Sequence, residues 1–312
     1  MSTEKKLFLG YHDSSIMLLL LGYHTSISGR NKAKNIVKEH ESNLGIYEIP
    51  IKVYQVFLGS PRSLYSPIIS LKEQGAFNSC INEFNITIFS HAPYVLNLAK
   101  NSQNDADYVA KIYQRALDDL RIVKTMGGVG SVFHVGKYLK LSKEEAINNM
   151  YTNIKAILDK ISLDTHGVFI LETAAGQGTE LITTIQEFGA FYHRFSDEDK
   201  KKLKVCIDTC HVFAAGHKLT THEDMTNFID LVETHINWSN IALIHLNDSK
   251  KGCNSCVDRH ANICDGFIWK DDNSGLKKLL EFATDKAIPM VLETPLDGRD
   301  TEIKNICDMI KK

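Results

Sequence analysis

Residues 204–211 read KVCIDTCH, and this stretch carries the pattern that decides the fold. A short apolar run ends in a carboxylate, Asp208, and polar residues follow it at once. A strand that is buried between a sheet and its covering helices should be apolar along its whole length. A charged residue at its last position therefore indicates a function at the end of the strand.

Seven further apolar runs lie on either side of this one, and their last residues are 33 to 48 positions apart. The eight runs end at His24, Phe57, His91, His134, Glu172, Asp208, His245 and Glu293. Helical patterns occupy the gaps, at 31–42, 105–126, 143–163 and 225–235. Alternating strands and helices are typical of a parallel sheet. Eight near-regular units favour a closed barrel over an open doubly wound sheet. We therefore predict an α/β protein with a single (β/α)₈ TIM barrel.

The chain length fits one such domain, since a (β/α)₈ barrel needs about 250 residues and the chain has 312. The tetrapeptide LGYH occurs twice, at 9–12 and at 21–24. A small-residue turn and a helical pattern follow the second copy, so we assign the first barrel strand to it. Residues 1–15 are then an N-terminal extension with an exposed His12, and 16–312 form the catalytic barrel.

The composition is that of a soluble globular protein, with 43% hydrophobic and 24% charged residues. The longest early apolar run, 16–21, is far shorter than the roughly 20 residues of a membrane span, so we expect no membrane or secretory segment. An odd number of cysteines, seven, favours free thiols in a reducing, intracellular compartment. The net charge of −2 lacks the basic excess that is usual for a DNA-binding protein.

Beyond the first run, six runs end in His, Asp or Glu, and in a TIM barrel these ends converge on the active site. Carboxylates gathered there would repel one another unless cations lay between them. Two loops add three similar side chains: His211 lies three residues after Asp208, and Asp258 and His260 flank Arg259. In an extended loop, that last spacing puts both side chains on one side. The candidate metal ligands are His91, His134, Glu172, Asp208, His211, His245, Asp258, His260 and Glu293.

Five histidines and four carboxylates form a ligand set typical of zinc. A lone strand-end Asp more often caps a helix, and a lone His is more often a hydrogen-bonded structural residue. Agreement among six strands weakens that interpretation. Three Zn²⁺ ions need about twelve coordination positions, which nine residues, a bridging carboxylate, a water and substrate oxygens can fill. Three bound Zn²⁺ ions would also change the formal charge from −2 to +4.

The chain resembles the endonuclease IV family of AP endonucleases from about Gly22 to Glu293. The motifs that carry the resemblance are GYHTS (22–26), HAPYVLNL (91–98), FHVG (133–136), LETAAGQG (171–178), CIDTCHVFAAG (206–216), HLNDSK (245–250), VDRH (257–260) and LET (292–294). The resemblance implies a monomeric enzyme with three zinc ions, which cleaves double-stranded DNA on the 5′ side of an abasic site during base excision repair.

The resemblance also implies how the ligands divide. His91, His134 and Glu172 would bind the first zinc, and Glu172 would bridge to the second. Asp208, His245 and Glu293 would complete the second site. His211, Asp258 and His260 would bind the third zinc. Glu172 and Glu293 would act as catalytic residues while they hold metal.

Three further residues resemble the family's DNA-binding positions. Tyr94 and Val95 would enter the minor groove and fill the gap left by the flipped nucleotide, and Arg62, in GSPR (59–62), would enter the base stack. Flipping is cheapest where no base pairs or stacks, so an abasic site is the favoured substrate. The structural alternatives are an aromatic residue at the rim of the site and a solvated loop charge.

Two features depart from the family pattern. Residues 264–266 read CDG where the family usually has GEG, and the N-terminal extension is unusual. The tail over 258–270 resembles versions from large DNA viruses, which would place the protein in a viral factory or virion. Cys253, Cys256, His260 and Cys264 are spaced almost as in a zinc knuckle, but two gaps are one residue short and the barrel needs His260. A Cys253–Cys256 disulfide is disfavoured in a reducing compartment.

Two other functions are compatible with parts of this pattern. Sugar isomerases and epimerases share the barrel and use one or two metal ions, but they have no need of His211 or of the Asp258–His260 pair. A non-catalytic module that binds damaged DNA is the second alternative. The nine intact ligand positions argue against it.

Overall fold

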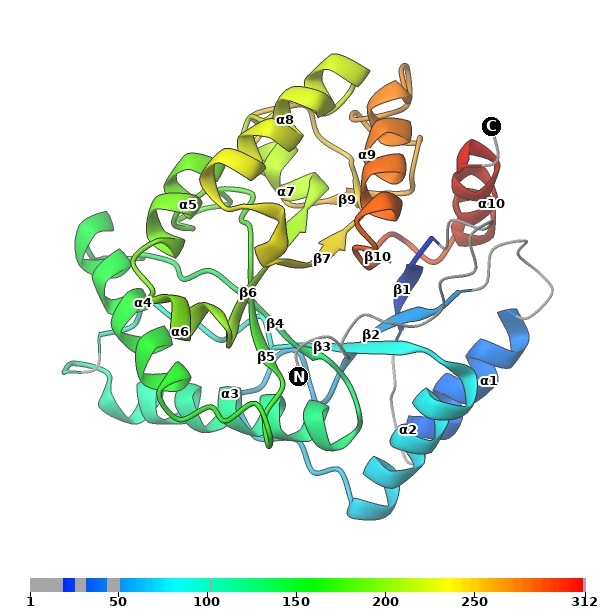
Figure 1. Cartoon of the computed structure of the whole chain (residues 1–312). Coiled ribbons are helices and arrows are strands. Elements are labelled where there is room, and N and C mark those ends of the chain that lie inside the picture. Colours follow the sequence, from blue (N-terminus) through cyan, green and yellow to red (C-terminus); the bar gives the residue numbers. More distant parts are fainter. Residues whose placement is uncertain (1–18, 26–31, 44–50, 102, 311–312) are drawn as a thin grey trace.

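The computed structural model describes residues 19–25, 32–43, 51–101 and 103–310. Its main sheet is a closed barrel of eight parallel strands in the order β1-β10-β7-β6-β5-β4-β3-β2, with helices around it (Figure 1). The barrel strands are β1 (Leu21–Thr25), β2 (Val53–Phe57), β3 (Thr87–His91), β4 (Gly130–His134), β5 (Val168–Glu172), β6 (Leu203–Asp208), β7 (Ile241–His245) and β10 (Met290–Leu292). The predicted TIM barrel is confirmed. The predicted extension over 1–15, with His12, lies outside the described residues.

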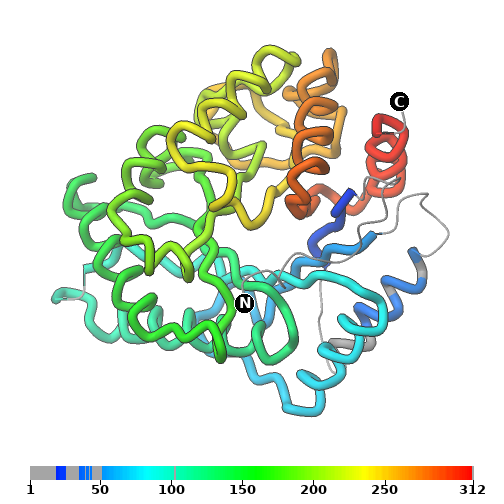
Figure 2. Tube along the Cα trace, viewed as in Figure 1, coloured from blue at the N-terminus to red at the C-terminus, as the bar shows by residue number. Residues whose placement is uncertain are grey.

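The strand ends lie close to the predicted positions. Six of the barrel strands end at the predicted residue, whereas β1 runs one residue further, to Thr25. β10 stops at Leu292, so Glu293 is the first residue after its strand. The last barrel strand, β10, lies beside the first, β1, and pairs with it, which closes the barrel. In Figure 2 the N-terminal part of the tube accordingly lies next to the C-terminal part.

The pairing register of neighbouring strands places several predicted ligands at the same height along the barrel axis. His134 pairs with Glu172 between β4 and β5, and Asp208 pairs with His245 between β6 and β7. His91 is likewise the partner of Phe57 at the end of β2. Because all eight strands are parallel, their carboxyl ends meet at one mouth of the barrel.

The helices surround the barrel in the usual alternation. Those before β6 are α1 (Lys32–Asn43), α2 (Leu71–Phe84), α3 (Ala106–Thr125), α4 (Lys143–Leu158), α5 (Ile185–Tyr192) and α6 (Asp197–Lys200). Those after it are α7 (Thr209–Ala214), α8 (His222–His235), the short 3₁₀ helix η2 (Trp238–Asn240), α9 (Ser274–Asp285) and α10 (Arg299–Ile310). A separate two-stranded sheet joins β8 (Asp248–Ser249) to β9 (His260–Ala261). Among the described residues, no helix combines the length and apolar character needed to cross a membrane.

Two predicted helix boundaries were wrong. The helix predicted over 143–163 ends at Leu158, because its last turn tightens: Lys160 N donates to Ile157 O, and the chain then turns toward β5. The helix predicted from Met225 begins at His222. There the Thr221 side chain and Asp224 form a reciprocal capping box, which stabilises an earlier start.

The apolar core has two layers, as the barrel geometry requires. One layer fills the inside of the barrel, and the larger one packs the outer faces of the strands against the helices. The inner layer consists of Val53, Phe89, Val132, Ile170, Cys206, Leu243 and Val291. This packed interior closes the barrel below the strand ends, so the polar side chains lie above it at the mouth of the barrel.

Candidate metal centre

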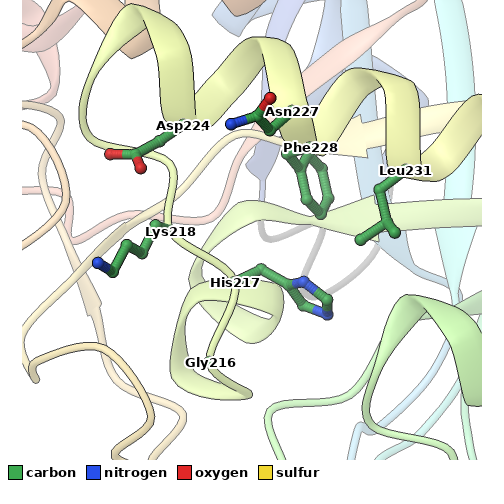
Figure 3. A pocket seen from close by; sticks show the side chains of 7 residues that line it. All are labelled: Gly216, His217, Lys218, Asp224, Asn227, Phe228 and Leu231. Atoms are coloured by element: carbon green, nitrogen blue, oxygen red, sulfur yellow. The ribbon is translucent and has the colours of Figure 1, made fainter.

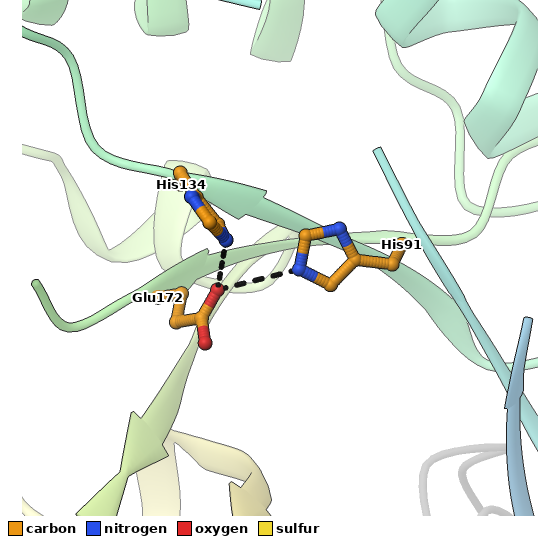
Figure 4. Close-up of side chains that lie close together, drawn as sticks. All are labelled: His91, His134 and Glu172. Atoms are coloured by element: carbon orange, nitrogen blue, oxygen red, sulfur yellow. Dashed lines mark ion pairs between the residues drawn. The ribbon is translucent and has the colours of Figure 1, made fainter. Parts of the chain in front are cut away.

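The first group of predicted ligands stands at the ends of three adjacent strands. His91, His134 and Glu172 end β3, β4 and β5, and Figure 4 shows both imidazole rings directed at one carboxylate. The distance from Glu172 Oε2 is 3.1 Å to His134 Nε2 and 3.4 Å to His91 Nε2. The three donor atoms lie within 4.8 Å of one another, close enough to share one ion.

The second group uses the other oxygen of the same carboxylate. His245 Nδ1 lies 2.7 Å from Glu172 Oε1, 3.2 Å from Glu293 Oε2 and 3.8 Å from Asp208 Oδ2. Glu172, Asp208, His245 and Glu293 each offer a donor atom to this group. Glu172 therefore belongs to both groups, which is the bridging position that the family resemblance implies.

The third group, which we call the loop-borne group, comes from segments that follow the barrel strands: His211 is in α7, His260 begins β9, and Asp258 lies in the loop just before it. Asp258 Oδ2 is 3.4 Å from His211 Nε2, and Asp258 Oδ1 is 3.2 Å from His260 Nε2. Arg259 between them is exposed and is not part of the group. His260 Nε2 also lies 3.6 Å from Asp208 Oδ2, so the third group adjoins the second.

The donor set fits metal ions. Glu172 Oε2 and His260 Nε2 are buried polar atoms without a hydrogen-bond partner among the described residues. A buried polar atom without a partner is costly, and a cation between the donors removes that cost. With five imidazoles and four carboxylates, the chemistry of the set matches zinc.

The charges within the groups shift the proton equilibria. Burial disfavours the charged form of Glu172, yet His245 and His134 hold its pKa well below the ordinary value. Burial also opposes protonation of His260, but the nearby carboxylates of Asp258 and Asp208 raise its pKa to about 9. For His91, burial dominates and lowers the pKa. The pKa values of these two histidines are thus shifted in opposite directions in the metal-free protein.

Comparison with known proteins identifies the family. The family model described as xylose isomerase-like TIM barrel matches residues 48–312. The putative endonuclease 4 of Acanthamoeba polyphaga mimivirus is 31% identical over 291 residues, which cover 92% of this chain and 88% of the relative. The probable endonuclease 4 of Persephonella marina is 31% identical over 293 residues, covering 93% and 95%. The chain belongs to the endonuclease IV family.

A solved structure supports this membership. Endonuclease IV from Thermus thermophilus superposes with a TM-score of 0.74 at 25% identity and covers 92% of this chain and 98% of its own. The predicted resemblance is confirmed, and with it the class of enzyme, a hydrolase. A viral and a bacterial relative match at the same identity, so a viral origin stays a prediction.

Some residues of this endonuclease IV family member were missed by the sequence analysis. Gln55 Nε2 donates to Glu293 Oε1 at 2.6 Å, and Gln55 Oε1 lies 2.8 Å from His245 Nε2. His24 Nδ1 lies 3.4 Å from the same Glu293 oxygen. Gln55 orients two predicted ligands at once. The signal was present, because Gln55 is a polar residue near the end of the apolar run IKVYQVF.

Two residues just beyond strand ends, Thr173 after β5 and Asn247 two positions after β7, orient further ligands. Asn247 Nδ2 donates to Asp208 Oδ2 at 2.7 Å, and its Oδ1 accepts from Glu293 N at 2.8 Å. The Thr173 carbonyl lies 2.8 Å from His211 Nδ1, which leaves His211 Nε2 facing Asp258. Such neighbours set the tautomer and direction of metal-ligating side chains.

Asp248 organises the loop that carries Asp258 and His260. Its buried carboxylate accepts hydrogen bonds from four backbone N–H groups, those of Ser249, Cys264, Gly266 and Ile268. A Cβ atom at Gly266 would lie 2.4 Å from Asp248 Oδ1, so this position requires glycine. The departure from the family pattern over 264–266 therefore retains the one residue that the contact needs.

The three predicted DNA-binding residues are on the surface. Tyr94 is 55% exposed and Val95 41%, and Arg62 is exposed on the preceding loop. Tyr94 N donates to Pro61 O at 2.9 Å, which joins the two loops. The Tyr94 ring lies 5.6 Å from the His91 ring and 5.4 Å from the His134 ring. The structure thus brings the three residues to one side of the metal groups, and their roles stay a prediction.

A cavity of about 230 Å³ opens onto these groups. Its lining consists of His91, Tyr94, His134, Lys137, Gln177, Glu180, His211, Asp258, His260 and Glu293. A different cavity, of about 330 Å³ beside α8, is shown in Figure 3 and contains none of the predicted site residues. In that cavity His217 Nε2 accepts a hydrogen bond from Ile185 N, which is a structural role.

The cysteines of the knuckle-like spacing form no metal-binding group among the described residues. All seven are free thiols, and neither Cys253 nor Cys256 belongs to any group of potential metal ligands among the described residues. His260 belongs to the barrel group with His211 and Asp258. The spacing that resembles a zinc knuckle therefore brings together no such site in the described part of the chain.

Proposed function

We propose that the chain is a zinc-dependent AP endonuclease. It would hydrolyse the phosphodiester on the 5′ side of an abasic nucleotide in double-stranded DNA and leave a 3′-hydroxyl and a 5′-deoxyribose phosphate. The observation that supports this most is the third group of ligands, His211, Asp258 and His260. Three adjoining metal sites could together contact the attacking, the leaving and a non-bridging oxygen of one phosphate.

The proposed ligand division follows the three groups. His91, His134 and Glu172 would hold the first zinc; Glu172, Asp208, His245 and Glu293 the second; His211, Asp258 and His260 the third. Bound zinc supplies a Lewis acid for the phosphate and lowers the pKa of water to near neutrality. No third site is needed for sugar isomerisation, the principal alternative on this barrel.

Two carboxylates are placed to handle protons. Glu172 is buried at the centre of both strand-borne groups, and Glu293 lines the cavity where substrate would enter. Neighbouring His245 counters the effect of burial on Glu293 and holds its pKa well below the ordinary value, so it is ionised near neutral pH. An ionised carboxylate at this position can accept a proton from an attacking water.

Recognition of the substrate depends on the exposed residues beside the cavity. Tyr94 and Val95 follow the ligand His91 on one loop, and Arg62 lies on the loop bonded to it. We propose that these three side chains fill the space that the flipped abasic nucleotide leaves in the duplex. Flipping costs least where a base is missing, so the cavity selects abasic DNA.

We also propose that the protein acts as a monomer in a reducing intracellular compartment. Seven free thiols, two of them exposed, support this compartment. A viral factory or virion is the specific location that the viral-type tail suggests. Light scattering of the purified protein should give the mass of one chain, and a stable dimer would contradict the monomer.

One assay tests the enzymatic proposal. The purified protein is incubated with a duplex that carries a single tetrahydrofuran abasic analogue, and the ends of the product are identified. A single cut with a 3′-hydroxyl, together with close to three zinc ions per chain by elemental analysis, is the expected result. The matched undamaged duplex serves as the control. Equal cutting of both duplexes, or predominantly magnesium in the protein, would refute the proposal.

A further inference from the structure

The lining of the cavity at the metal groups includes one positively charged side chain, Lys137, which has no role in the proposed function. Among the described residues that line this cavity, Lys137 is the only lysine or arginine. Its side chain is 41% exposed, and its Nζ lies 3.3 Å from Glu180 Oε1. Histidines, carboxylates and neutral side chains make up the rest of the lining.

The backbone of Lys137 is held firmly. Asn97 Oδ1 accepts from Lys137 N at 2.9 Å, and Asn97 Nδ2 donates to Lys137 O at 3.0 Å. Lys137 also forms an isolated antiparallel bridge with Glu180. Tyr108 ties Asn97 to the loop of Val95, since its hydroxyl donates to Val95 O and contacts Asn97 N. The ammonium group therefore extends on a flexible stem from a fixed base beside the Tyr94–Val95 loop.

Lys137 also lines a second, larger cavity of about 670 Å³. That cavity adds Lys100 and Lys140, together with Tyr138 and the exposed Leu139. Lys137 is thus at the junction between the metal cavity and a neighbouring groove in which two further lysines lie. An anionic strand that left the metal cavity in this direction would meet Lys137 first.

We propose that Lys137 binds a phosphate of the DNA strand immediately beside the scissile bond, where the strand passes from the metal cavity into the groove lined by Lys100 and Lys140. This inference rests on the proposed function. A lysine binds phosphate as a point charge, and its long side chain can move between partners. The Lys137 side chain is 41% exposed, although Glu180 is only 11% exposed, so water screens the pair from the lysine side and a phosphate can replace Glu180 as the partner.

Glu180 has a second contact that keeps it in place after the exchange. Glu180 Oε2 accepts from Gln177 N at 2.9 Å, and Gln177 Oε1 accepts from Asp258 N at 3.2 Å. Release of Lys137 therefore leaves the loop of the third metal group attached. The ammonium can be drawn to DNA without disturbing Asp258.

The salt dependence of cleavage tests this role. For wild type and Lys137→Gln, kcat and KM are measured on the tetrahydrofuran duplex over a range of salt concentrations. Loss of one phosphate contact should reduce the slope of log(kcat/KM) against log[salt] by about 0.9. We expect KM to rise roughly 3- to 30-fold and kcat to stay within about twofold. Lys137→Arg should restore the slope, since it keeps the charge.

The matched control is Lys201→Gln. Lys201 pairs with Glu198 at 2.7 Å, but it precedes β6 and so lies at the opposite end of the barrel. Its removal should change neither KM nor the slope. A slope in Lys137→Gln equal to that of wild type would overturn the phosphate contact while the proposed function stands. No incision by wild type would refute the proposed function, and the inference with it.

A second variant separates phosphate binding from a merely structural role. Glu180→Gln keeps an oxygen that can accept from Gln177 N but removes the charge that competes for Lys137. KM at low salt should then fall by about two- to fivefold, as for a pair with one partly exposed partner. A rise in KM would show that the Lys137–Glu180 pair supports the loop, and would count against the exchange of partners.

Discussion

The strand-borne and loop-borne metal groups are positioned by different means. His91, His134 and Glu172 are the last residues of three adjacent strands, so the backbone pairing of the barrel sets their separation. Asp258 and His260 lie on a connection that depends on the side chain of Asp248 and on the short β8–β9 pairing. The barrel itself therefore provides the first group, whereas the third depends on a few individual hydrogen bonds.

The two groups also differ in exposure and in proton affinity. In the first group Glu172 is 1% exposed and His91 2%, although His134 is 26% exposed; on the loop Asp258 is 32% exposed and His260 17%. Burial lowers the pKa of His91, but the carboxylates around His260 overcome burial and raise its pKa to about 9. This contrast predicts that the loop-borne metal is the more easily lost of the two.

The largest effect should come from the residue that the two strand-borne groups share. Glu172→Gln removes the charge between His134 and His245 and should lower the rate of incision by more than ~10²-fold. Elemental analysis should find that zinc is lost from the strand-borne groups while one ion remains on the loop. Glu281→Gln, on an exposed face of α9, is the matched control and should behave as wild type. Loss of all three ions would show that the groups are not independent.

The converse experiment targets the loop. Asp248→Asn weakens the four backbone hydrogen bonds that hold the segment after His260, so the chain should lose one zinc and keep two. The rate should fall by roughly 10- to 100-fold, as is typical when a group that orients metal ligands is removed. Asp265→Asn, an exposed acid in the same loop, provides the control. If the Asp248→Asn variant cut DNA slowly but still bound three zinc ions, the proposed dependence of the loop metal on Asp248 would be wrong.

In the wild-type protein, lowering the pH should release zinc from the loop-borne group before the strand-borne group. In the metal-free protein the pKa of His260 is raised to about 9, and that of His211 is raised because its carboxylate neighbours outweigh burial. Below pH 9 zinc must displace a proton from His260, and also from His211 when that residue is protonated, so affinity at the loop should fall about tenfold per pH unit for each proton displaced. In the first strand-borne group the pKa of His91 is lowered and only that of His134 is raised, by Glu172, so acid protonates fewer ligands there than on the loop. Zinc competition at several pH values should therefore show the loop metal leaving first; simultaneous release would contradict this.

The smallest effect concerns Tyr94, whose ring lies on the strand-borne group without being a ligand. Tyr94→Leu should keep all three zincs and reduce kcat/KM on an abasic duplex about fivefold, which corresponds to roughly 1 kcal/mol of lost stacking. A frayed abasic substrate, in which nothing must be held open, should be cut at the wild-type rate. Equal losses on both substrates would mean that the ring supports His91 and His134 instead.

Much of the site was accessible from residue types and spacing, because parallel strands of a barrel all end at one mouth. Any polar residue that terminates a buried run must lie there, however far apart the runs are in the chain. This reasoning found the nine potential ligands, and the structure brings them into three adjoining groups. It could not divide them between groups, since spacing along the chain does not say which strand ends are neighbours across the mouth.

The sequence by itself determined the strand–helix alternation, the closed barrel and the pool of ligands, because hydrophobic periodicity and strand-end chemistry are local properties. Only the tertiary structure decided the contacts between distant residues. Gln55 bonds to Glu293, 238 positions away, and Asp248 binds backbone N–H groups as far on as Ile268. Contacts with Asn97 and Glu180, both distant in the sequence, hold Lys137 in the lining of the metal cavity. Hydrogen bonds depend on distances of a few tenths of an ångström, which packing sets and no sequence period encodes.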